Sequence, residues 1–172
     1  MNPERSVLDR YTKIRAAGAV GNMKDITSMM TLETGDNVLD VGCGTGAPTK
    51  LLADNVHSVI RMFCLDKLPE MIDAAVQYQS ADNITYVAAA ACDLKIIDKY
   101  QNKFDRVVAN YVLHWVYNME DTLKAIHKYL KPGGQCFVNM CCAGFEKDAL
   151  SAIAAHTKEP KWAIYMEVNK KP

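Results

Sequence analysis

The 172-residue sequence lacks an excess of charge of either sign. It holds 20 lysines and arginines and 20 aspartates and glutamates, which gives a formal net charge of +0. A strong excess of one sign is typical of proteins that bind nucleic acid or an anionic membrane by long-range electrostatics. The sequence therefore predicts neither nucleic acid nor a membrane as a partner.

Long apolar segments are missing as well. The longest uninterrupted apolar run extends from Val87 to Cys92, far short of the roughly 20 residues that a membrane-spanning helix needs. Residues 1–6 contain no apolar core of a secretion signal. We therefore expect a cytoplasmic protein.

The six cysteines lack the spacing of a metal site or a redox pair. No two of them form a C-x-x-C pair, and the four histidines have no metal-ligand spacing either. The cysteines are Cys43, Cys64, Cys92, Cys136, Cys141 and Cys142. Because most of them fall in apolar, strand-like segments, we expect free buried thiols and no metal.

The sequence does contain apolar strand-like runs that alternate with amphipathic segments. The predicted strands cover residues 38–41, 58–65, 84–91, 104–109 and 135–142. The predicted helices cover residues 6–18, 49–55, 118–130 and 146–155, with others beginning near Asn22 and at Pro69. Residues 94–103 are expected to be irregular, and residues 131–134 to form a turn. This alternation is typical of one doubly wound α/β domain around a mostly parallel sheet.

The first predicted strand runs into a turn with three glycines at alternate positions, Gly42-Cys43-Gly44-Thr45-Gly46. Glycine lets the chain turn sharply and, because it has no Cβ, lets a ligand touch the main chain. In a doubly wound sheet, ligands bind beyond the carboxyl ends of the strands. The sequence therefore predicts a ligand site at this turn and at the residues that follow the other strands.

Two cofactors fit the glycine pattern. Gly42, Gly44 and Ala47 satisfy the dinucleotide fingerprint, with Asp66 about 20 residues further on as the ribose-binding acid. Read from Asp40 as D-x-G-x-G-x-G, the same turn matches the first motif of methyltransferases that use S-adenosylmethionine. The glycines alone do not choose between them.

Three acids at successive strand ends favour the second cofactor. Asp40, Asp66 and Asp93 follow or end the first three predicted strands. S-adenosylmethionine carries an ammonium and a sulfonium and no phosphate, so an acid at Asp40 suits it, whereas the same acid would repel a diphosphate. Asp66 can accept hydrogen bonds from the ribose hydroxyls, and Asp93 can accept one from the adenine amino group. The alternative is that these aspartates are turn or cap residues.

From Thr34 to Cys142 the sequence resembles the class I methyltransferases. The resemblance includes the glycine turn, Asp66, Asp93 and the turn at residues 130–134. Asn110-Tyr111-Val112-Leu113-His114-Trp115-Val116 is similar to the motif after the fourth strand in carboxyl methyltransferases of the juvenile hormone acid and trans-aconitate type. Residues 161–168 are similar to a W-x-x-Y-M-x-D-V segment of the juvenile hormone acid subgroup.

This resemblance implies roles for particular residues. His114 and Trp115 are expected to be catalytic, with Tyr11 and Trp115 contacting the substrate. The residues implied in cofactor binding lie at the strand ends, and they are Asp40, Gly42, Gly44, Gly46, Asp66, Lys67, Cys92, Asp93, Leu94 and Asn110. The alternative is that Trp115 anchors the following helix in the core and that His114 is an interior histidine.

The resemblance also implies an activity and a domain plan. The expected reaction transfers a methyl group from S-adenosylmethionine to the carboxylate of a small apolar acid such as farnesoic acid, leaving S-adenosylhomocysteine. Alternatives are another small acceptor such as trans-aconitate, a cofactor-binding module without catalysis and, least favoured, an NAD-dependent oxidoreductase. We expect a helical cap over 1–33, a cofactor-binding core over 34–142 and the start of a substrate-covering region over 143–172, without strands six and seven.

Overall fold

The computed structural model describes residues 21, 23, 25–55 and 60–140. Several predictions fall outside these residues: the helix at 6–18 with Tyr11, the beginning of the second strand, the end of the fifth strand and the helix at 146–155. The domain plan includes these segments, and it stays a prediction.

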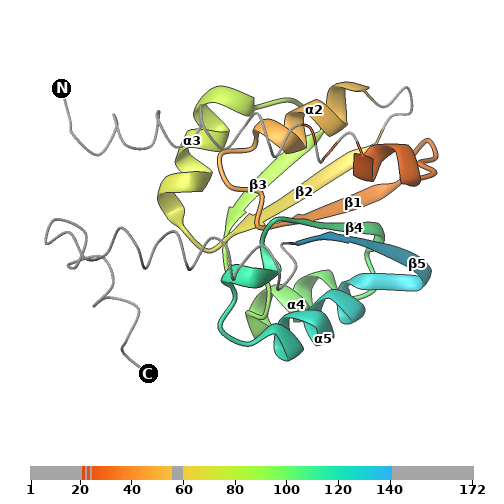
Figure 1. Cartoon of the computed structure of the whole chain (residues 1–172), viewed down its shortest axis with the longest axis vertical. Helices are drawn as coiled ribbons and strands as arrows, with labels where there is room; N and C mark the ends of the chain where they lie inside the picture. The colour runs from red at the N-terminus through yellow and green to blue at the C-terminus, as the bar shows by residue number, and fades with distance from the viewer. Residues whose placement is uncertain (1–20, 22, 24, 56–59, 141–172) are drawn as a thin grey trace, which may run out of the picture. The chain divides into compact units, whose positions relative to one another are not determined.

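A five-stranded sheet forms the centre of the described structure (Figure 1). Its strands are β1 (Asn37–Val41), β2 (Arg61–Asp66), β3 (Ile84–Ala88), β4 (Phe104–Asn110) and β5 (Leu130–Asn139). They follow the order β3-β2-β1-β4-β5, and every neighbouring pair is parallel. Strands β2 and β3 lie on one side of β1, and β4 and β5 lie on its other side. The strand order therefore reverses between β1 and β4. The predicted doubly wound α/β fold is confirmed.

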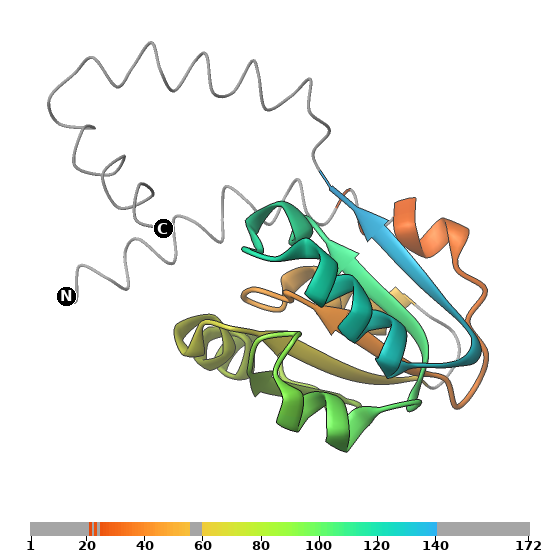
Figure 2. The same cartoon turned by 90° about the horizontal axis from the view of Figure 1, so that it is seen from below.

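Helices cover both faces of this sheet. They include α2 (Ala47–Asn55), α3 (Pro69–Gln79), α4 (Leu94–Tyr100), α5 (Met119–Tyr129) and the 3-10 turn η1 (Leu113–Trp115). Residues 25–29 are also helical, in the region where a helix is predicted to begin near Asn22. Helices α2 and α3 lie on one face and α4 and α5 on the other (Figures 1 and 2). Across the described residues, no helix has both the length and the apolar character needed to cross a membrane.

The buried side chains form two clusters because alternate residues of a strand point to opposite faces. In β1, Val38 belongs to the cluster that includes Leu52 of α2 and Ile72 of α3. Its neighbour Leu39 belongs to the cluster that includes Ile97 of α4 and Ile126 of α5. The near-continuous apolar strands are thus explained by burial on both faces.

The expectation that residues 94–103 are irregular was wrong, because Leu94–Tyr100 form helix α4. The Asp93 side chain accepts a hydrogen bond from the Lys95 backbone N–H at 2.9 Å and caps the helix. Ile97 is buried at 6% exposure against the sheet. One buried turn between polar residues is too short to show a helical period in the sequence.

The predicted turn at residues 131–134 is part of β5 instead. Strand β5 begins at Leu130, which pairs with Phe104, but the next pair is Arg106 with Gln135. The intervening residues are therefore accommodated as an irregularity within the strand, where Gly133 has a φ of +81°. The glycines mark this irregularity rather than a turn before the strand.

Candidate functional site

The segments that carry the predicted site residues meet at the carboxyl ends of the strands. The glycine turn follows β1, Asp66 ends β2, Cys92 and Asp93 come after β3, and Asn110 ends β4. Because β1 and β4 are neighbours across the point where the strand order reverses, this edge is where a doubly wound sheet binds its ligand.

The three glycines of the turn have left-handed backbones, with φ of +74° at Gly42, +56° at Gly44 and +79° at Gly46. A Cβ on Gly42 would lie 2.2 Å from Cγ2 of Val112, and one on Gly46 would lie 2.7 Å from Oη of Tyr86. A Cβ on Gly44 would meet nothing within 4 Å. Two of the glycines thus permit close packing inside the protein, whereas Gly44 presents main chain to open space.

Asp66 holds the turn in place beside the end of β2. Its Oδ2 accepts a hydrogen bond from the Gly44 N–H at 2.9 Å, and its Oδ1 accepts one from the Leu68 N–H at 3.0 Å. The Gly42 and Cys43 N–H groups both donate to the Leu65 carbonyl, at 2.7 and 3.0 Å. An ionised carboxylate has about four lone-pair sites, so Asp66 retains acceptor capacity for hydroxyl groups of a ligand.

Asp40 lies beneath the turn rather than on its surface. Its side chain is 2% exposed, and its Oδ2 accepts a hydrogen bond from Oγ1 of Thr49 in α2 at 2.5 Å. Burial raises the pKa of Asp40 to about 6, the Thr49 hydrogen bond opposes this rise, and the nearby Asp66 charge adds to it. Asp40 thus contributes a buried charge under the turn and ties β1 to α2. The sequence did not single out Thr49.

Two thiols are packed under the same turn. Cys43 is 6% exposed and Cys64 is 0% exposed, and the Cys43 thiol donates to the Gly44 carbonyl at 3.7 Å. The neighbouring Cys64 thiol and burial raise the pKa of Cys43, and burial raises the pKa of Cys64. The prediction of buried free thiols is confirmed for these two. It was wrong for Cys92 and Cys136, which are exposed: Cys92 follows the end of β3, and Cys136 is on the edge strand β5.

Asp93, in the segment after β3, caps helix α4, which was the alternative to its predicted role as a ligand residue. One carboxylate oxygen of Asp93 accepts from the Lys95 N–H, and the side chain is exposed. Leu94 beside it is 71% exposed, an unusual position for a large apolar side chain. The hydroxyl of Tyr129 donates to the Ala91 carbonyl at 2.7 Å and fixes the approach to this segment. The second oxygen of Asp93 and the Leu94 side chain remain accessible to a ligand.

The end of β4 leads into a strained connection. Asn110 is 9% exposed, and Tyr111 after it has a φ of +56°, which is uncommon for a residue other than glycine. The Tyr111 N–H donates to the Asn139 carbonyl of β5 at 2.7 Å, which helps to hold this conformation. Strained backbone of this kind concentrates at functional sites.

Trp115 is not a core anchor, because it is 63% exposed. Leu113, at 2% exposure, anchors η1 in the core instead. His114 is half-buried between Tyr111, at a ring distance of 6.0 Å, and Trp115, at 5.2 Å. Tyr117, which the sequence did not single out, is 99% exposed. An accessible group of aromatic side chains thus follows β4.

Other predicted site residues give less information. Lys67 is exposed after β2, and Tyr11 lies outside the described residues. Val112 and Tyr86, which fix the spacing around Gly42 and Gly46, had no signal in the sequence, because their roles depend on which strands become neighbours.

These features first define a class: a doubly wound domain with an open glycine turn after β1 and an acid at the end of β2. The comparison with protein families then identifies it. The methyltransferase domain family matches residues 32–171, and the chain belongs to this family. The predicted resemblance to class I methyltransferases is confirmed at this level, and the likeness to the juvenile hormone acid subgroup stays a prediction.

Curated relatives carry more than one activity. The chain is 31% identical over 128 residues to a malonyl-[acyl-carrier protein] O-methyltransferase of Acetivibrio thermocellus, covering 73% of this chain and 42% of the relative. It is 35% identical over 112 residues to a demethylmenaquinone methyltransferase of Staphylococcus epidermidis, covering 64% and 45%. The chain therefore spans less than half the length of these two relatives.

Solved structures share the fold. A putative methyltransferase of Haloferax volcanii, in complex with the Trm112 methyltransferase activator, matches with a TM-score of 0.62 at 28% identity, over 75% of this chain and 58% of that chain. Phosphoethanolamine N-methyltransferase 2 of Haemonchus contortus, solved with S-adenosylhomocysteine, matches with a TM-score of 0.56 at 21% identity, over 74% and 33%. The second match shows a shared fold.

Proposed function

We propose that this chain binds S-adenosylmethionine and transfers its methyl group to the carboxylate of a small apolar acid. The observation that carries the proposal is the Gly44–Asp66 pair. The backbone of Gly44 faces open space, and its N–H donates a hydrogen bond to the Asp66 carboxylate at the edge of the sheet. Membership of the methyltransferase domain family supports it.

The residues at this edge fit the cofactor. Gly44 would let the ligand lie against the main chain, and the remaining lone pairs of Asp66 would accept the ribose hydroxyls. The free oxygen of Asp93 would accept the adenine amino group, and the exposed Leu94 would pack against the ring. S-adenosylmethionine supplies an electrophilic methyl group bound to a positively charged sulfur.

Asp40 supports this cofactor over a dinucleotide. With a pKa raised by burial to about 6, it is mostly ionised at neutral pH, and its charge lies directly under the turn. A negative charge in a buried position acts over several ångströms because it is poorly screened. It would favour a cationic ligand and disfavour a diphosphate at the same place.

The surface after β4 supports an apolar acceptor. Large apolar side chains are exposed along the connection from β4 into α5, and they are Trp115 at 63%, Tyr117 at 99%, Met119 at 37% and Leu123 at 43%. Exposed apolar surface of this kind marks binding sites. An apolar acid such as farnesoic acid could lie there with its carboxylate hydrogen-bonded to the Trp115 indole N–H, beside His114.

A carboxylate acceptor would need little chemical activation. A carboxylic acid with a pKa near ~4 is already ionised at neutral pH, so no general base is needed. The contribution of the protein would then be to hold the oxygen in line with the methyl carbon. The named acceptor of one relative, a malonyl group, also ends in a carboxylate.

A second candidate is methyl transfer to a different small acceptor. The similarity to a demethylmenaquinone methyltransferase favours it, because the two relatives differ in the acceptor they are named for. Turnover of farnesoic acid, trans-aconitate, a malonyl thioester and demethylmenaquinone, measured with S-adenosylmethionine, separates these candidates. Methylation of none of the three carboxylic acids, in a chain that binds the cofactor, would contradict a carboxylate acceptor.

The cofactor assignment is tested by calorimetric titration with S-adenosylhomocysteine and, separately, with NAD. We expect S-adenosylhomocysteine to bind and an Asp66→Asn variant to bind it more weakly by about 1–3 kcal/mol, because an acceptor of the ribose hydroxyls is lost. The matched control is Asp73→Asn, which removes an exposed carboxylate from α3. Binding of NAD alone would overturn the proposal, and equal affinity of both variants would remove Asp66 from its role.

A further inference from the structure

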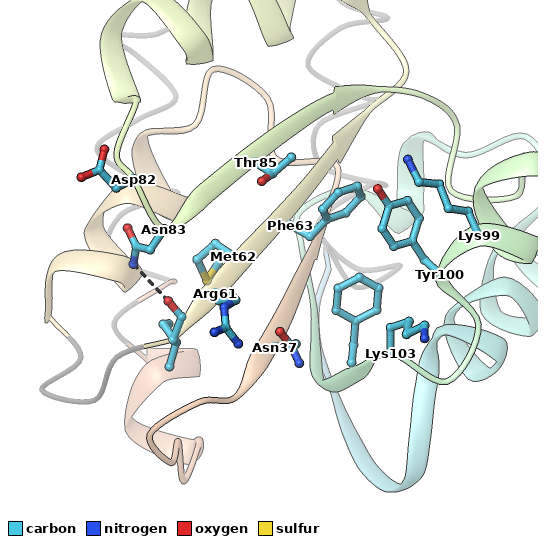
Figure 3. Close-up of a pocket in the computed structure, with 12 residues that line it drawn as sticks. Asn37, Arg61, Met62, Phe63, Asp82, Asn83, Thr85, Lys99, Tyr100 and Lys103 are labelled. Carbon is cyan, nitrogen blue, oxygen red and sulfur yellow. Dashed lines mark hydrogen bonds between the residues drawn. The ribbon is translucent and has the colours of Figure 1, made fainter.

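A cavity of about 530 Å³ lies away from the proposed active site (Figure 3). Its lining includes Asn37 and Arg61, the first residues of β1 and β2, and Phe104, the first residue of β4. The cavity is therefore at the amino-terminal edge of the sheet, whereas the glycine turn is at the carboxyl edge. A strand rises about 3.3 Å per residue, so the five residues of β1 separate the two regions by about 15 Å.

The cavity exists because this part of the sheet is poorly covered. Phe63 of β2 pairs with Thr85 of β3. Both lie on the face of the sheet that α4 covers nearer the carboxyl ends of these strands. Phe63 is only half-buried and Thr85 is exposed. Helix α4 has seven residues and ends at Tyr100, which packs against Phe63 with a ring distance of 4.2 Å. Among the described residues, nothing extends the cover over Thr85.

One wall of the cavity is aromatic. The ring of Phe63 lies 4.2 Å from Tyr100 and 5.9 Å from Phe104, and all three residues line the cavity. Figure 3 shows the Phe63 and Tyr100 rings side by side. The polar side chains of Asn37, Asn83 and Thr85 also line it. A cavity of this size with an apolar wall and a few polar groups has the features of a small-molecule site.

Positive charge rims the cavity, with Lys99 and Lys103 on the side of Tyr100 and Arg61 beside Met62 and Asn37 (Figure 3). Arg61, Lys99 and Lys103 are all exposed, and none takes part in the ion pairs formed among the described residues. The ammonium of Lys99 lies 5.0 Å from the centre of the Tyr100 ring. The only carboxylate among the lining residues is Asp82, which Figure 3 shows at the opposite end from Lys99 and Tyr100.

We propose that this cavity binds a planar aromatic organic anion. The ring of the ligand would pack on Phe63 and Tyr100, and its carboxylate or sulfonate would lie at the rim, where the positive charges of Lys99, Lys103 and Arg61 attract it. Burial of a flat apolar ring provides most of the affinity, and the three cations provide selectivity for an anion. Because of its distance from the glycine turn, this is a second site, separate from those of the cofactor and the methyl acceptor.

The probe is 2-naphthoate, with the uncharged 2-naphthamide as its matched ligand. Calorimetric titration is done on the full chain with S-adenosylhomocysteine at saturation, so that the carboxyl edge of the sheet is already occupied. We expect 2-naphthoate to bind at one site and 2-naphthamide to bind at least fivefold more weakly. No binding of 2-naphthoate at millimolar concentration, or equal binding of the two, would overturn the proposal.

Two variants locate the site. Arg61→Gln with Lys103→Gln should weaken 2-naphthoate binding about tenfold, since two of the charges that attract the anion are removed. Thr85→Tyr should abolish binding, because it fills the cavity from a strand position that accepts an aromatic side chain. Lys95→Gln, which removes an exposed charge from α4 outside the cavity, is the control.

Unchanged 2-naphthoate affinity in the charge variant would overturn the proposal even if Thr85→Tyr did not fold. The affinity for S-adenosylhomocysteine, measured alone, reports separately on the proposed function.

Discussion

The two sides of the carboxyl edge of the sheet differ in how completely they are organised. On the β1 and β2 side, Asp66 and Asp40 are hydrogen-bonded within the protein, and Gly42 and Gly46 leave no room for a side chain. On the β4 side, Trp115 and Tyr117 stand out at 63% and 99% exposure. One side is preorganised, and the other presents apolar surface without a partner among the described residues.

This difference fits two ligands with different demands. A rigid turn lowers the entropic cost of binding because it is already in the binding conformation. An exposed aromatic surface binds by removing apolar area from water, which places few demands on geometry. The contrast is therefore consistent with a defined cofactor on one side and an apolar acceptor on the other, and the three predictions below test it.

The largest effect is expected at the most crowded glycine. Gly42→Ala should lower the free energy of unfolding by about 2–5 kcal/mol, from ~1–2 kcal/mol for a left-handed alanine and ~1–3 kcal/mol for the clash with Val112. Chemical denaturation measures it. Val112 is β-branched and stiff at χ1, so it cannot easily move aside.

Gly44→Ala is the matched control in the same turn. Its Cβ would enter open space, so only the backbone cost of about 1–2 kcal/mol applies. The affinity for S-adenosylhomocysteine should nevertheless fall, because the methyl group would occupy the place where the ligand approaches the main chain. Equal loss of stability in both variants, or unchanged affinity in Gly44→Ala, would contradict the different roles assigned to the two glycines.

The next effect is a pH dependence at Asp40. Burial raises its pKa from 3.8 to about 6, which corresponds to a cost of roughly 3 kcal/mol for the ionised form in the folded protein. The folded state binds this proton more tightly than the unfolded state does, so Asp40 lowers stability progressively as the pH rises from about 4 to about 6. Asp40→Asn should remove this decline and unfold at higher denaturant concentration at pH 7.

The same variant tests the electrostatic role of Asp40. S-adenosylmethionine carries a sulfonium charge that S-adenosylhomocysteine lacks, so Asp40→Asn should reduce affinity for the first more than for the second. Calorimetric titration of both ligands above pH 6 gives the comparison. An equal change for the two ligands would show that Asp40 acts only through Thr49 and the packing of α2.

The smallest effect on stability is expected on the β4 side. Trp115→Phe should change the free energy of unfolding by less than about 0.5 kcal/mol, because the side chain is mostly exposed. Turnover of a carboxylic acid should fall about tenfold or more, since the lost N–H bond to a carboxylate is worth ~1.5–3 kcal/mol. Tyr117→Phe, which keeps the ring, is the control. Unchanged turnover would remove Trp115 from the acceptor site.

Much of the site could be read from the sequence, because its parts are local. The glycine turn follows its strand directly, and each of the three acids is within a few residues of the end of one of the first three strands. Parallel strands bring such residues to one edge, so the pattern predicted their proximity. Helix α4 was missed because its cap, Asp93, was interpreted as a ligand residue and its single buried turn has too little periodicity.

The order of apolar runs and the residues at their ends determined the doubly wound fold and the edge of the sheet at which the candidate site residues meet. The tertiary structure alone decided which of these residues are accessible. It buried Asp40 against Thr49, exposed Trp115 and made Leu113 the core anchor in its place. Within the described residues it also left Thr85 exposed and Phe63 half-buried, in a cavity rimmed by three cations at the opposite edge. The physical reason is that burial depends on which helix lies over a residue and how far that helix extends, which the spacing of residues along the chain does not specify.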